Sequence, residues 1–177
     1  MSLLDVDYLR ECFREENGRL YWKERPVGHF PSVGDWKRWH TRFAGKEAGH
    51  LSVRKLGGNR WLVRLSGISM LRYTIIWAMY KDAWPDELDH ENRNSLDDQI
   101  GNLRLADQSQ NMANSRKRKN NASGYKGVRW HKRARRWCAQ ITVNYQQIHL
   151  GYFDTPEEAY AVYCDAAVQY FGQFACG

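Results

Sequence analysis

The sequence predicts an α+β protein made of two folded parts joined by a basic linker. Helix-like and strand-like apolar patterns alternate in the first part of the chain. A polar strand–loop–strand–helix pattern follows at residues 86–114, and we expect it to complete a first domain at 1–114. After a linker at 115–124, residues 125–177 show three strands with short loops and then one helix. This order predicts a small three-stranded antiparallel sheet packed on one helix.

The composition favours a polyanionic partner. The chain has 177 residues, of which 42% are hydrophobic and 14% aromatic, enough to build a core. Its net charge is +7, with a pI of about 9.3. The stretch from Gln108 to Phe153 contains many Lys and Arg residues and no Asp or Glu. Nucleic acid is the first expectation for such a balance, and an anionic membrane surface is the second.

Targeting signals and metal-binding cysteine pairs are absent from the sequence. No apolar run approaches the roughly 18 residues of a membrane span. The N-terminus "MSLLDVDYLREC" carries acids early and does not resemble a signal peptide. We therefore expect a cytoplasmic protein. The four cysteines are far apart without a CxxC pair, so we expect small buried or semi-buried thiols, no zinc and no disulfide framework.

The N-terminal region mixes helices and strands. "DVDYLRECFREE" at 5–16 has helical apolar spacing, with Asp5 as a candidate cap. "GRLYW" and "NRWLVRL" are typical of short strands, and "LRYTIIWAMY" of a buried helix. Between them, "VGHFPSVGDWKRWHTRFAGKEAGH" is expected to be a long aromatic and basic loop. Its Trp36 and Trp39 either pack in the protein or contact nucleic acid.

The stretch "LDHENRNSLDDQIGNLRLADQSQN" at 88–111 is too polar to build a core. "LDH" ends a strand, "ENRNSLDDQIGN" forms a loop, and "LRL" is a second short strand. Asp107 caps the following helix, and Gln110 completes a capping box. Such a segment is either a solvated connection or a chemical site.

Four residues of this stretch are candidates for metal-assisted chemistry. Asp89 and Asn111 offer hard oxygen ligands of the kind that hold Mg²⁺ beside substrate phosphates. His90 is a candidate general base, and Asn102 a candidate to orient its imidazole. The alternative is a helix cap and a turn of solvated polar residues. Three neighbouring acids are expected to be solvated and dispensable: Glu91, Asp97 and Asp98.

The spacing of these residues resembles the HNH motif of the ββα-metal nucleases. Asn102 follows His90 by twelve residues, and Asn111 follows nine later, as in phage and intron-encoded homing endonucleases of that type. Further upstream, Leu71-Arg72 stands where such enzymes often have a His-Arg pair. The resemblance implies a DNA endonuclease that hydrolyses phosphodiester bonds, by nicking or double-strand cleavage.

The same resemblance implies roles for individual residues. His90 would act as general base and Asn102 would brace it, while Asp89 and Asn111 would hold Mg²⁺, with Mn²⁺ able to substitute. Arg104 is a candidate phosphate contact. One active site per chain implies a monomer that nicks, or a weak dimer that cuts both strands.

The C-terminal segment has two distinct predicted faces. In "RWCAQITV", Trp137, Ala139, Ile141 and Val143 alternate with more polar residues. In "QIHLGYF" we expect Ile148, Leu150 and Tyr152 to point inward. A helix with a strong N-terminal signature, "DTPEEAYAVYCDAAVQYFG", would cover the apolar face. The polar face is then either shaped to enter a major groove or simply solvated.

This segment resembles the apetala-two and ethylene-response-factor DNA-binding domains, which bind double-stranded DNA through a three-stranded sheet. Together with the linker, the resemblance implies one set of DNA-contacting residues: Arg116, Lys117, Arg118, Lys119, Lys126, Arg129, Trp130, Arg133, Arg135, Arg136, Gln140, Thr142, Gln147 and His149. Two alternatives stay open. One is a non-catalytic DNA-binding regulator that keeps a nuclease scaffold, and the other is a nuclease acting on branched or RNA substrates.

Overall fold

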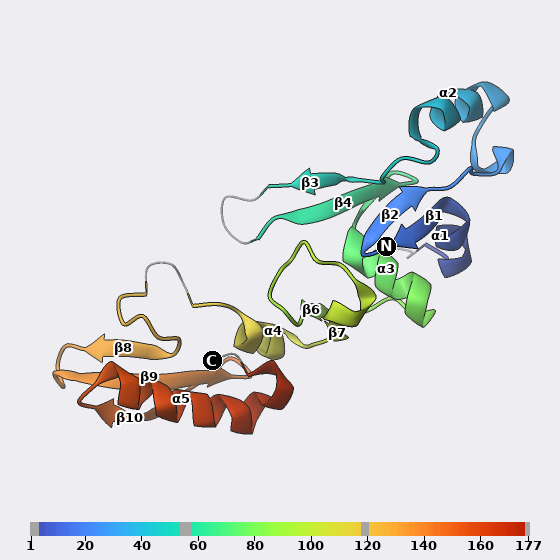
Figure 1. The fold of residues 1–177 in the computed structure, drawn as a ribbon. Helices are drawn as coiled ribbons and strands as arrows, with labels where there is room; N and C mark the ends of the chain where they lie inside the picture. The colour runs from blue at the N-terminus through green and yellow to red at the C-terminus, as the bar shows by residue number, and fades with distance from the viewer. Residues whose placement is uncertain (1–3, 54–57, 118–120, 176–177) are drawn as a thin grey trace. The chain divides into compact units, whose positions relative to one another are not determined.

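A computed structural model describes residues 4–53, 58–117 and 121–175. The chain folds into two compact units, residues 1–105 and 106–177 (Figure 1). The helix that ends the expected first domain groups with the second unit, because it contacts the C-terminal helix and the turn after it. The linker prediction at 115–124 falls partly outside the described residues, as do Arg118 and Lys119.

The first unit contains short helices and three small antiparallel sheets, with strand orders β1-β2, β3-β4-β5 and β6-β7. Its elements are α1 (Val6–Cys12), β1 (Phe13–Glu16), β2 (Arg19–Trp22), η1 (Val27–His29), α2 (Val33–Phe43), β3 (His50–Ser52), β4 (Arg60–Leu65), β5 (Ile68–Leu71), α3 (Arg72–Lys81), β6 (Leu88–His90), η2 (Ile100–Asn102) and β7 (Leu103–Leu105).

The first helix is shorter than its sequence predicts. Asp5 caps α1 as expected, since its carboxylate accepts from Asp7 N at 2.7 Å. The helix ends at Cys12, and Phe13–Glu16 forms β1, which pairs antiparallel with β2. The prediction of helix through residue 16 is wrong because pairing with β2 places Phe13 in the core, where it is 1% exposed.

The segment expected to be a long loop contains a helix. Ser32 caps α2 by accepting from Asp35 N at 3.1 Å. Trp39 packs against the core, and Trp36 Nε1 donates to the Arg25 carbonyl at 2.9 Å. The loop prediction is wrong because aromatic residues at helical spacing give this segment an apolar face to bury. Both tryptophans therefore take the packing role.

The core of the first unit forms around α3, as the sequence predicts. Ile75, Ile76 and Ala78 are fully buried on this helix and pack with Leu9 and Leu20. The expectation of unbonded thiols is confirmed for the three described cysteines. Burial raises the pKa of the Cys12 thiol, which keeps it protonated within the core.

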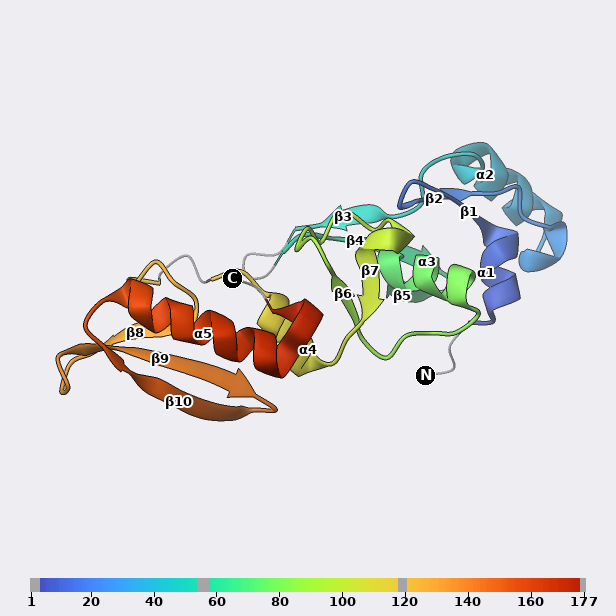
Figure 2. The same cartoon turned by 60° about the horizontal axis from the view of Figure 1, so that its bottom comes forward.

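The second unit contains one short helix and a sheet backed by a long helix. Its elements are α4 (Gln108–Asn114), β8 (Val128–His131), β9 (Arg136–Val143), β10 (Gln146–Phe153), α5 (Pro156–Phe171) and η3 (Gly172–Phe174). The sheet is antiparallel, in the order β10-β9-β8, and α5 runs along one of its faces (Figure 2). Thr155 and Glu158 form a capping box at the start of α5, with Pro156 in its first turn. The predicted meander and helix are confirmed.

Gly127 fixes how closely α5 approaches the sheet. Its φ is +73°, and an ideal Cβ there would overlap the Tyr163 ring and lie 2.8 Å from the Gln140 carbonyl oxygen. Gly127→Ala is expected to lower the free energy of unfolding by roughly 2–4 kcal/mol, from left-handed strain plus overpacking. Urea unfolding followed by tryptophan fluorescence measures this loss.

Gly124→Ala is the matched control, because Gly124 has φ +79° and an ideal Cβ there would meet no atom of the described residues closer than Lys117 Nζ at 4.0 Å. It should cost only the backbone strain, roughly 1 kcal/mol. Equal losses in the two variants would contradict the close approach of Tyr163 as the cause.

Candidate catalytic site and nucleic-acid interface

The polar stretch forms a β-hairpin with a long, internally bonded loop. Strands β6 and β7 pair antiparallel, with Asp89 opposite Arg104 and His90 opposite Leu103. Asp107 and Gln110 form the predicted capping box at the start of α4. The strand, loop, strand and helix are thus confirmed as local elements. The α4 helix lies in the second unit, so the assembly of a metal-binding ββα site stays a prediction.

A buried carboxylate joins the candidate base to the core. His90 Nε2 lies 2.9 Å from Asp98 Oδ1, and Arg72 Nε donates to Asp98 Oδ2 at 2.8 Å. The side chains of Asp98 and Arg72 are 1% and 3% exposed, and that of His90 is 11% exposed. The Tyr73 ring meets the imidazole edge-on, with centroids 5.0 Å apart. Asp98 at Nε2 and the packed Tyr73 ring therefore both hold the imidazole in place.

The prediction that Asp98 is a solvated acid is wrong, because its side chain is buried. A run of "SLDDQ" gives no periodic sign of burial. The signal lay in Arg72, an arginine at the start of a largely apolar helix, because a buried guanidinium requires a buried acceptor. Of the other two acids, Glu91 is exposed, and Asp97 Oδ2 accepts from Asn92 Nδ2 at 2.6 Å.

Asn102 braces the loop, as the sequence predicts, but Asp98 and not Asn102 bonds the imidazole. Asn102 Oδ1 accepts from Asn92 N at 3.0 Å, and its Nδ2 donates to the Asp97 carbonyl at 2.7 Å. These bonds tie the end of the loop to its beginning. The prediction that Asn102 orients the histidine is thus replaced by an indirect role through the loop backbone.

Asp89 is buried and paired with Arg104 across the hairpin. Arg104 donates to Asp89 Oδ2 from Nε at 2.9 Å and from Nη2 at 2.8 Å. The phosphate contact predicted for Arg104 is untested, and the structure assigns this arginine to Asp89. The oxygen donors of Asp89 and Asn111 suit Mg²⁺ in type. Among the described residues no three His, Cys, Asp or Glu side chains gather into a metal-binding group.

The open face of the β8–β10 sheet is polar, as its alternation predicts. The register places Gln140 beside His149 and Thr142 beside Gln147. Arg129 Nε donates to Gln140 Oε1 at 2.9 Å, which aligns two long side chains on this face. Most of the predicted DNA-contacting residues that the structure describes are exposed: Arg116, Lys117, Arg129, Trp130, Arg133, Arg135, Arg136, Thr142, Gln147 and His149.

A β-bulge adds Tyr152 to the open face. The β9–β10 register shifts between His149 and Gly151, so Tyr152 pairs with Cys138 rather than with an apolar-face residue. Its ring lies 4.6 Å from that of His149 and 5.0 Å from that of His131. The prediction that Tyr152 points inward is wrong because strict alternation does not anticipate the extra residue.

Trp130 lies on the other face of the sheet from Arg129. It pairs with Trp137, and their rings meet edge-on at 5.2 Å. Trp137 packs against the core between sheet and helix, whereas Trp130 is 46% exposed.

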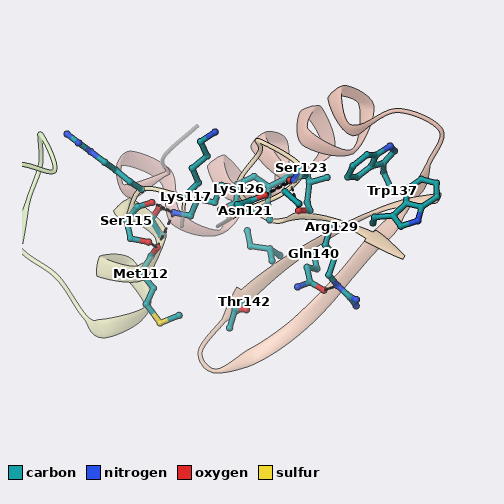
Figure 3. Close-up of a pocket in the computed structure, with 18 of the residues that line it drawn as sticks. Met112, Ser115, Lys117, Asn121, Ser123, Lys126, Arg129, Trp137, Gln140 and Thr142 are labelled. Atoms are coloured by element: carbon teal, nitrogen blue, oxygen red, sulfur yellow. Dashed lines mark hydrogen bonds between the residues drawn. The ribbon is translucent and has the colours of Figure 1, made fainter. Parts of the chain in front are cut away.

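A pocket of about 660 Å³ lies within the second unit, beside the edge of the sheet. Figure 3 shows Lys117 and Ser115 toward one end of it, and Arg129, Gln140 and Trp137 toward the other. No carboxylate is among the described residues that line the pocket. Its wall is therefore positively charged and continues the charge of the open sheet face.

Lys126 donates hydrogen bonds to carbonyl groups at the C-terminus of α4. Its Nζ donates to the carbonyls of Met112 at 3.1 Å and Ser115 at 2.6 Å, and also to that of Ala113. These are carbonyls that a helix C-terminus leaves without intrahelical partners. The structure thus gives Lys126 a capping role, and its predicted DNA contact is untested.

Residues 123–173 match the AP2 domain family. The second unit thus carries an AP2 domain, a DNA-binding fold of one sheet and one helix, as its sequence predicted. The chain is also 34% identical over 88 residues to Protein 3.8 of Escherichia phage T7. The aligned residues make up 50% of this chain and 72% of the phage protein. The chain belongs to the same family as that phage protein. No solved structure matches it.

None of the described helices is long and apolar enough to cross a membrane.

Lys126→Met separates capping from DNA binding. Removing the ammonium leaves three helix-terminal carbonyls without this donor, so the free energy of unfolding should fall by roughly 1–3 kcal/mol. The salt dependence of DNA binding should stay that of the wild type. Lys132→Met, in the exposed β8–β9 turn, is the control and should leave stability unchanged. A lower salt slope with unchanged stability would assign Lys126 to phosphate instead.

Proposed function

We propose that this protein binds duplex DNA in a sequence-dependent way through the open face of the β8–β10 sheet. The observation that supports this most strongly is the AP2 match to the unit whose uncovered face carries aligned polar side chains. The B-DNA major groove is wide enough for a β-ribbon, and its base edges suit these side-chain types. Arginine reads guanine, glutamine reads adenine, and threonine contacts either hydrogen-bonding edges or the thymine methyl.

Charge supports the affinity of this contact. The sheet lies in the acid-free stretch from Gln108 to Phe153. The cations of the β8–β9 turn and of the pocket can meet the phosphates on both sides of the groove. Binding that releases counterions from several phosphates weakens steeply as salt rises.

Arg129→Ala tests the sheet face. Loss of a base-reading arginine should weaken binding to a duplex selected by the wild type from a random library by roughly 1–3 kcal/mol, and relax the preference at one base pair. Fluorescence anisotropy at fixed salt measures the affinity, and repeated selection measures the preference. Lys81→Ala removes an exposed cation from the first unit and should change neither. Wild-type affinity and preference in Arg129→Ala would exclude this face.

We further propose, as a second candidate function, that the first unit hydrolyses a DNA phosphodiester bond with His90 as general base. The observation that favours it is the contact of His90 with the buried Asp98 carboxylate, which is also paired with Arg72. Burying these groups costs desolvation free energy, and a turn exposed to solvent would not incur that cost. His90 accepts a proton from water, and the water oxygen bonds to phosphorus. The bond between phosphorus and the 3′ oxygen breaks, and the leaving 3′ oxygen takes a proton from solvent.

In this reaction Asp89 is the proposed ligand, within the first unit, of a divalent cation. Mg²⁺, when bound there, supplies electrostatic stabilisation of the phosphate. The competing proposal is a DNA-binding regulator without catalysis, for which the AP2 match alone suffices.

His90→Ala separates catalysis from regulation. With Mg²⁺ or Mn²⁺, the wild type should convert supercoiled plasmid to nicked or linear forms, and His90→Ala should cut at least roughly 10²-fold more slowly. Both proteins should retard the plasmid on a gel equally. A wild type that binds the plasmid and leaves it supercoiled with either metal supports the regulator.

A further inference from the structure

We infer that Asp98, held by Arg72, is a positioning residue that fixes which nitrogen of His90 carries the proton. This inference rests on the proposed hydrolytic function for its catalytic consequence, while its structural content can be measured without any cleavage. Neither the AP2 match nor the likeness to the phage protein assigns a role to Asp98 or Arg72.

The two oxygens of Asp98 serve two different donors. Oδ1 faces His90 Nε2 at 2.9 Å, and Oδ2 accepts from Arg72 Nε at 2.8 Å. An ionised carboxylate only accepts hydrogen bonds, so the nitrogen that faces it must carry a proton. In the neutral imidazole this selects the tautomer with hydrogen on Nε2 and the lone pair on Nδ1. The nitrogen that can accept a proton from water is then Nδ1.

Arg72 prevents the carboxylate from turning away. Its Nη1 donates to Glu47 Oε1 at 3.1 Å, and its guanidinium lies 4.7 Å above the centre of the Trp61 ring. Because Arg72 begins α3, its backbone is held by the most buried helix of the first unit. A guanidinium stays protonated in proteins and is always a donor. The Asp98 oxygen beside it must therefore always be an acceptor.

This geometry predicts a specific effect of one isosteric change. In Asp98→Asn the side chain has one acceptor oxygen and one donor amide group. The permanent donor Arg72 takes the oxygen, which turns the amide group toward His90. Two donors cannot face each other, so the neutral imidazole moves its proton to Nδ1 and presents the Nε2 lone pair to the amide. The nitrogen needed to accept a proton from water is then already protonated.

The experiment observes the tautomer directly in the full chain. Protein labelled with ¹⁵N-histidine is studied by long-range ¹H–¹⁵N correlation, at a pH where the neutral ring dominates. The chain has six histidines, and the His90 signals are assigned by their loss in His90→Gln. Wild type should show a protonated Nε2 and an unprotonated Nδ1, and Asp98→Asn should show the reverse.

Asp97→Asn is the matched control, since it makes the same chemical change one residue away. The Asp97 carboxylate bonds Asn92, and no described bond joins it to His90. This variant should keep the wild-type tautomer. The wild-type spectrum is itself a test and remains one even if Asp98→Asn does not fold. A wild-type His90 protonated on Nδ1, or an unchanged tautomer in folded Asp98→Asn, would overturn the inference.

Plasmid cleavage under single-turnover conditions tests the consequence. Asp98→Asn should cut on the order of 10²-fold more slowly or worse, with the DNA affinity of the wild type, because only general-base catalysis is lost. Cleavage at the wild-type rate despite a switched tautomer would remove Asp98 from the reaction. A wild type that cuts nothing but shows the expected tautomer would refute the hydrolytic function alone.

Discussion

The polar loop between β6 and β7 depends on the hydrogen bonds of the buried Asp98 carboxylate. Its two oxygens connect the start of α3 to the end of β6, through Arg72 on one side and His90 on the other. Removing one partner of such a group leaves an unpaired charge in the interior, which is far more costly than a lost surface contact. A loop that the sequence makes almost wholly polar is therefore attached to the core through this carboxylate. The backbone and side-chain bonds of Asn102 then close the loop at its base.

The second unit depends on a different constraint, the close packing of α5 on one face of a small sheet. Buried alanines on α5, with Tyr163 over the backbone of Gly127, let the helix lie close to the strands. This packing uses the apolar residues of every strand and leaves the alternate residues outside. The outward residues are consequently long, polar and cationic, which is the surface that a DNA groove accepts. The bulge in β10 brings an aromatic ring to the same face.

The two units differ in where they place their charged side chains. In the second unit, the open sheet face and the acid-free pocket bring cations near each other, as a phosphate-binding surface requires. The first unit instead buries two acids, Asp89 and Asp98, and each of them pairs with an arginine. An ordered histidine among buried ion pairs matters most where a reacting group must be held in one orientation.

Much of this protein is determined locally by its sequence. The caps of α1, α4 and α5, the strands of the AP2 sheet and the buried helix α3 follow from short-range patterns of side-chain size, capping and alternation. The polar hairpin at 88–105 also followed from its sequence, because turn residues and capping boxes act within a few residues.

Tertiary structure alone decided three other features. Residues Phe13–Glu16 form a strand rather than a helix because they pair with β2. The helix α2 is stabilised because its aromatic face packs against the core. The role of Asp98 depends on Arg72, 26 residues earlier, which no local pattern connects to it. Long-range pairing of buried charges is set by where the backbone brings two residues together, and the sequence of either segment does not contain that information.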